Sequence, residues 1–163
     1  ALGMSHANVY RHFASKAALR DAVVERWLQG VSGPLEAIGG ADPPARLSAW
    51  LWGLIHAKRR KVLDDPGMFA TYHVIAQAAH AVVDQHVAEL RRQIAAIIRA
   101  GIADGSFGPR NPDLAAGAVL MATLPFHHPH FLQDKLVRPS DDEVEAAIRL
   151  LLAGLRAGAT RPA

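Results

Sequence analysis

The 163-residue sequence contains no cysteine, which excludes disulfide bonds and thiol catalysis within it. It also contains no run of about 18 or more apolar residues, the length that a membrane-spanning helix needs. We therefore expect no membrane partner and take the cytoplasm as the default location. Acidic residues are missing from residues 1–20, whereas Arg11, Lys16 and Arg20 are basic there. The electrostatic field over this segment is therefore positive.

The common signatures of catalysis are also missing. The sequence has no spaced acid–base pair, no nucleophile with a base, no phosphate-cradling glycine loop and no metal-hydrolase helix motif. We therefore predict that the protein is not an enzyme. Hydrophobic residues make up 50% of the chain and charged residues 20%, as in an ordered globular protein of one or two domains. The net charge of +3 is compatible with nucleic acid as a partner but does not require it.

Apolar residues recur at three- and four-residue spacings along the chain, which predicts an all-α fold. Leu19, Ala22, Val23 and Trp27 share one face of a helix expected to end near Gly30. The stretch 30–44, with four glycines and three prolines, predicts a loop. Helices are then expected from Asp42 to about residue 61, over 66–80, from there to Gly105, and over about 112–124 and 141–157.

Four consecutive cations, Lys58 to Lys61, stand at the end of the helix that starts at Asp42. We interpret them as a solvated last turn that complements the helix dipole. A second contact with DNA is the alternative.

The opening segment combines a tight turn at Gly3, a short helix over about 6–12, a break and a second helix. Ser5 and Ser15 stand where their hydroxyls can cap the two helices. The first helix and the break carry several hydrogen-bonding side chains: Asn8, Tyr10, Arg11, His12 and Lys16. So polar a helix is not explained by core burial, and it suits a DNA groove.

The spacing of Gly3, Ser5, Tyr10, His12, Phe13, Ser15, Lys16 and Leu19 resembles the TetR family of bacterial transcriptional regulators. The pattern covers about residues 2–24, and it departs from the family at Ala17 and Ala18, where glutamate is common. The resemblance implies that the sequence is N-terminally truncated, beginning inside a helix-turn-helix domain without its first helix and most of its second. It also implies that residues 1–30 bind DNA, with the recognition helix at about 6–12 and the connecting helix at about 16–30. Residues 31–163 would then form a helical ligand-binding and dimerisation domain.

Carried over position by position, the resemblance implies that Tyr10, His12 and Lys16 contact the DNA backbone. We assign Val9 and Phe13, which are apolar, to ordinary core packing. Base edges would be met by His6, Ala7 and Asn8. The full set of expected DNA-binding residues is Ser5, His6, Ala7, Asn8, Tyr10, Arg11, His12 and Lys16. One motif neutralises few phosphates, so useful affinity requires a homodimer on a near-palindromic site in double-stranded DNA.

The dimer interface is expected in the last two long helices, about 112–124 and 141–157. The family places its intermolecular helix bundle there, although an intramolecular core explains the apolar stripes equally well. The resemblance also implies a repressor released from its operator by a small-molecule effector, with no cofactor. Candidate effector-binding residues combine aromatic and polar side chains: Trp50, Phe69, Tyr72, His73, His80, Met121, Phe126 and His127. Ordinary core packing is the alternative for each aromatic.

The sequence places His127, His128 and His130 within four residues, a cluster that suggests a metal-binding site. Pro125 and Pro129 interrupt the helix there, and the cluster contains no carboxylate or cysteine. We therefore expect no metal site and keep a metal-responsive regulator as the alternative function. Less favoured is a metal-dependent enzyme using acidic residues such as Asp134. A purely structural helical module would leave the polar opening segment unexplained.

Overall fold

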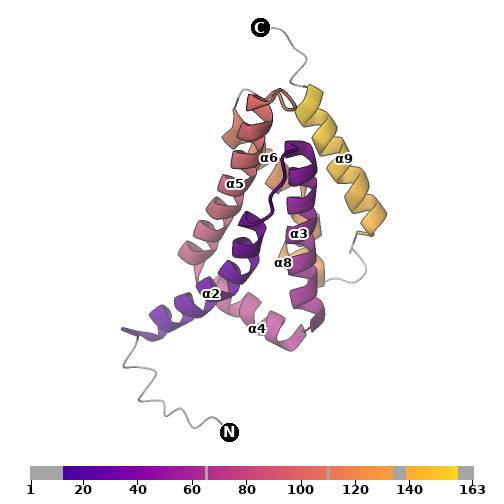
Figure 1. Ribbon diagram of the computed structural model, residues 1–163. Helices are drawn as coiled ribbons and strands as arrows, with labels where there is room; N and C mark the ends of the chain where they lie inside the picture. Colours follow the sequence, from indigo (N-terminus) through magenta and orange to yellow (C-terminus); the bar gives the residue numbers. More distant parts are fainter. Residues whose placement is uncertain (1–12, 65, 110, 134–138, 158–163) are drawn as a thin grey trace.

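The computed structural model describes residues 13–64, 66–109, 111–133 and 139–157, and they form helices joined by short connections (Figure 1). The all-α prediction is confirmed. The helices are α2 (Lys16–Glu36), α3 (Pro43–Asp64), α4 (Pro66–Gln77), α5 (His80–Ala103), α6 (Pro112–Ala122), α7 (Leu124–His127), α8 (Pro129–Gln133) and α9 (Asp141–Ala157). Among these described helices, none is long and apolar enough to cross a membrane.

The main hydrophobic core forms where α3 packs against α2, α5 and α9 (Figure 1). Helix α6 packs against α5. The largest fully buried side chains of this core include Leu47, Trp50, Leu51, Leu54, Ile94, Ile97, Ile98 and Ile148. A second, smaller cluster joins Val24 and Leu28 of α2 to Ala79, between α4 and α5. Helix α2 is therefore held at two separate places.

Side chains cap several of the described helices, and Ser15 does so as predicted. The amide of Ala18 donates to Ser15, and the amide of Leu114 donates to Asn111. The carboxylate of Asp42 accepts from the amide of Ala45. Before α9, Ser140 and Glu143 form a reciprocal capping box, in which each backbone amide donates to the other side chain.

The predicted loop over 30–44 is wrong in its first half, because α2 continues to Glu36. The helix buries Val24, Leu28, Val31 and Leu35, one position along from the predicted face, and Val23 is 37% exposed. Gly30 and Gly33 face solvent, so their poor helix propensity is offset by burial on the opposite side. The helix therefore crosses residue 30, where the sequence places the domain boundary.

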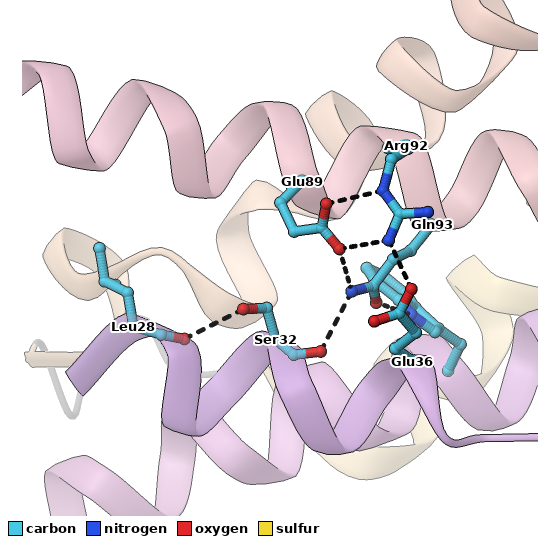
Figure 2. Close-up of polar contacts among 7 residues, drawn as sticks. Leu28, Ser32, Glu36, Glu89, Arg92 and Gln93 are labelled. Atoms are coloured by element: carbon cyan, nitrogen blue, oxygen red, sulfur yellow. Dashed lines mark hydrogen bonds and ion pairs between the residues drawn. The ribbon is translucent and has the colours of Figure 1, made fainter. Parts of the chain in front are cut away.

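A buried glutamine joins the three central helices (Figure 2). The side-chain amide of Gln93, on α5, donates to the carbonyl of Ser32 on α2 at 3.1 Å and to Glu89 at 2.7 Å. Its oxygen accepts from the indole N–H of Trp50 on α3 at 2.9 Å. Arg92 adds ion pairs to Glu36 and Glu89 at the surface. Since a buried polar group left without partners is costly, this network sets the register of α2, α3 and α5.

Replacing Gly101 by alanine is expected to destabilise the protein by about 1–3 kcal/mol. A Cβ atom at this buried position in α5 would lie 2.2 Å from Cδ2 of Phe107, whose ring is only 2% exposed and so has little room to move. Chemical denaturation measures the effect. Gly33→Ala is the matched control, because nothing lies within 4 Å of its Cβ position. That variant should be up to about 1 kcal/mol more stable than wild type, and equal behaviour of the two variants would contradict the packing argument.

Candidate ligand-binding site

A cavity of about 910 Å³ lies among α2, α3, α4, α5, α6 and α7. Its wall is mainly apolar, with contributions from Trp27, Phe69, Tyr72, Val83, Leu90, Leu120 and Leu124. The rings of Trp27 and Tyr72 stack with centroids 5.2 Å apart. Leu114 and Met121 on α6 also line the cavity and are more than half exposed in the single chain. Size and lining suit a small organic molecule.

Most of the expected effector-binding residues line this cavity: Phe69, Tyr72, His73, His80, Met121 and His127. The other two are placed elsewhere. Trp50 is 1% exposed in the main core, where its indole N–H donates a hydrogen bond to the side-chain oxygen of Gln93. Phe126 is also buried in that core, at 8% exposure. Both aromatics therefore pack in the core, as the alternative interpretation had it, and do not line the cavity.

The sequence interpretation missed the buried cation in the wall. Lys58 is only 5% exposed and lines the cavity, so a solvated last turn is wrong for this residue. Its position continues the buried stripe of α3 at helical spacing, after Leu51 and Leu54. Its neighbour Arg59 is also largely covered, and it pairs with Asp141 on α9. The helical spacing of this stripe would have predicted that Lys58 is buried, but the run of four cations suggested a solvated helix end instead.

His86 was missed in the same way. It is 8% exposed, lines the cavity and starts the buried stripe of α5 that continues through Leu90 and Gln93. The wall also contains Asp84 and Arg91, both exposed. Gly117 on α6 makes room for Arg91, whose Nη2 lies 2.7 Å from the position a Cβ would take.

Lys58 and His86 face each other inside the wall. The ammonium Nζ of Lys58 lies 3.4 Å from Nε2 of His86 and 5.4 Å from the centroid of the Trp27 ring. Burial, helped by the positive charge of Lys61, lowers the pKa of Lys58 to about 8. At neutral pH the group is therefore still mainly charged.

The buried histidines of the wall are neutral at neutral pH. Burial, followed by the charge of Lys58, lowers the pKa values of His86 and His127 to about 3. Nε2 of His127 lies 3.3 Å from the hydroxyl of Thr123. An ammonium can only donate, so Nε2 of His86 accepts from Lys58 and its ring proton sits on Nδ1. That buried Nδ1 has no hydrogen-bond partner among the residues described.

The three histidines of the metal-binding alternative are not brought together in the described part of the chain. His127 is buried, whereas His128 and His130 are exposed. Within the described ranges, no three His, Cys, Asp or Glu side chains are grouped so that they can hold a metal ion. Asp134, the acid named for the enzyme alternative, lies outside the described residues.

Of the expected DNA-binding residues, only Lys16 is described, and it is exposed at the first position of α2. Ser5, His6, Ala7, Asn8, Tyr10, Arg11 and His12 lie outside the described residues, as does the recognition helix at about 6–12. Phe13, expected to pack inside, is half-buried.

Residues 43–148 match the family model described as "Tetracyclin repressor-like, C-terminal domain". The chain belongs to the TetR family. The TetR match begins with α3 and ends within α9, so it covers most of the elements that line the cavity. It also lies outside the opening motif, so it confirms the TetR resemblance from separate residues. No curated protein matches the chain.

Proposed function

We propose that this TetR-family regulator is a sequence-specific DNA-binding repressor, released from its operator by a small molecule in the cavity. The observation that carries the proposal is the position of α2. Trp27 and Leu28 of this helix line the cavity, and Lys16 at its first position belongs to the predicted DNA-binding motif. A ligand that prefers one placement of α2 would therefore shift the population of DNA-competent molecules. The protein would act in the cytoplasm, without catalytic activity of its own.

The repressor would act as a homodimer through α6 and α9. Exposed apolar side chains on both helices support this interface: Leu114 and Met121 on α6 are 69% and 67% exposed, and Leu150 on α9 is 74% exposed. Single exposed apolar side chains are ordinary on protein surfaces, so the interface rests chiefly on the family resemblance, with which these side chains agree. Residues 1–30 would then supply the DNA-reading part and residues 31–163 the ligand-binding part, with α2 shared between them.

Fluorescence anisotropy with genomic DNA fragments at two salt concentrations tests the function. We expect saturable, sequence-dependent binding that weakens steeply as salt rises, because phosphate contacts release counterions. Tyr10→Ala and Lys16→Ala should weaken binding to all fragments alike. Asn8→Ala should also reduce the preference for the best fragment, since an asparagine amide can contact adenine through two hydrogen bonds.

Arg26→Ala serves as the matched control. It removes an exposed cation from the same helix, about 15 Å beyond Lys16 at about 1.5 Å per residue, and should leave DNA binding nearly unchanged. An absence of sequence-dependent binding by the full-length protein would contradict the proposed function. Equal losses on specific and random DNA for Asn8→Ala would contradict the base-reading role of that residue.

A further inference from the structure

The cavity wall contains a buried positive charge without a negative partner. Lys58 is 5% exposed, and no carboxylate forms an ion pair with it among the described residues. Its nearest groups are a neutral imidazole and the face of an indole ring. Buried charges are normally paired, because removing an ion from water is costly. The ammonium of Lys58 is therefore free to form an ion pair with an anion bound in the cavity.

A second unused donor lies beside it. The N–H at Nδ1 of His86 is buried and finds no acceptor among the residues described. The ring is held by the contact between its other nitrogen and Lys58, so the donor has a fixed direction. Unsatisfied buried donors are rare in folded proteins and commonly indicate a missing acceptor.

We infer that the cavity binds a mainly apolar molecule carrying a single carboxylate, and that this carboxylate pairs with Nζ of Lys58. The inference rests on the proposed effector function of the cavity and specifies the ligand class.

The remaining wall favours an apolar, partly aromatic body. The wall also contains the exposed Asp84 and Arg91 and several histidines, but most of its lining is aliphatic or aromatic. Phe69 lies against the stacked pair of Trp27 and Tyr72. Flat rings pack well against such faces. The one acid in the wall, Asp84, is exposed, and among the described residues it forms no ion pair with the buried Lys58.

The affinity for a carboxylate should depend on pH. Lys61 on α3 lowers the pKa of Lys58, and the charge of Lys58 in turn lowers the pKa values of His86 on α5, His127 on α7 and the following His128. Because the pKa values of His86 and His127 are lowered, both are neutral at and above pH 7. The free protein loses the Lys58 proton as pH rises past about 8, so affinity for the anion should then fall by up to about tenfold per pH unit.

Isothermal titration calorimetry with matched probes tests this inference on the full chain. The probes are 2-naphthoate and dodecanoate, each compared with its primary amide. At pH 7 we expect at least one carboxylate to bind at least about tenfold more tightly than its amide. Lys58→Met should weaken the binding of that carboxylate by at least about thirtyfold, because the buried carboxylate loses its partner. The affinity for the amide should change by no more than about twofold.

Lys61→Met is the matched control. It removes the same charge one turn further along α3, from a side chain that also lies over Trp27 but does not line the cavity. It should change carboxylate affinity by less than about threefold. The inference is overturned if neither carboxylate binds more tightly than its amide, or if both lysine variants behave alike. A carboxylate preference without any effect on DNA binding would keep the inference and reject the proposed function.

Discussion

The Lys58→Met variant is expected to be more stable than wild type at pH 7, by up to about 3 kcal/mol in the free energy of unfolding. The lowering of the Lys58 pKa from 10.5 to about 8 corresponds to a cost of that size for keeping the ammonium charged inside the protein. Methionine has a similar length and no charge, so it removes the cost while filling the space. A residue that destabilises the free protein but binds ligand is common at functional sites.

Urea denaturation at pH 7 and at about pH 10.5 measures this effect. Between about pH 8 and 10.5 the unfolded chain keeps a Lys58 proton that the folded protein has released. The unfolding free energy of wild type therefore rises with pH across this window, and the advantage of the variant shrinks. Lys61→Met should differ from wild type by less than about 0.5 kcal/mol, as ordinary surface substitutions do. A Lys58→Met protein less stable than wild type at pH 7 would contradict the argument.

Mild acid is expected to destabilise the protein strongly. The pKa values of His86 and His127 are lowered from 6.5 to about 3, chiefly by burial and then by the charge of Lys58. Between these limits the unfolded chain binds protons that the folded protein does not. The unfolding free energy should therefore fall as pH falls below about 6.5, by about 1.4 kcal/mol per pH unit for each histidine. Both together would remove about 4 kcal/mol by pH 5, a large share of a typical domain's stability.

Thermal unfolding between pH 7.5 and 4.5 measures this loss. The double variant His86→Gln, His127→Gln should show a much flatter dependence on pH, because glutamine does not titrate. His56→Gln is the control, because His56 is an exposed histidine on α3 and its replacement should leave the slope unchanged. The same slope in wild type and the double variant would show that other groups govern acid unfolding.

The sequence predicts well the features that depend on neighbouring residues. Caps at Ser15, Asn111 and Ser140 are satisfied by backbone amides a few residues away, so local pattern is enough to find them. The cavity-lining stripe of α4, with Phe69 and His73, follows from helical spacing in the same way.

The features that the sequence does not predict depend on contacts between helices. Trp50 and Phe69 are both aromatic residues on amphipathic helices, yet one meets the core and the other the cavity. Nothing in the local pattern distinguishes them. Lys58 was misassigned because a lysine near a helix end is usually solvated, whereas here α2 and α5 cover it. In α2, burial of Val31 and Leu35 overrides the glycines that suggest a loop.

The hydrogen bond from Gln93 on α5 to Ser32 on α2 limits how α2 can tilt. A tilt of α2 that keeps the bond from Gln93 to the Ser32 carbonyl must pivot close to Ser32. Lys16 lies about 24 Å from that pivot along the axis, at about 1.5 Å per residue. A tilt of about 5° therefore displaces Lys16 by about 2 Å. In a symmetric pair of chains the two displacements combine, and half-sites about 34 Å apart leave little tolerance for such a change.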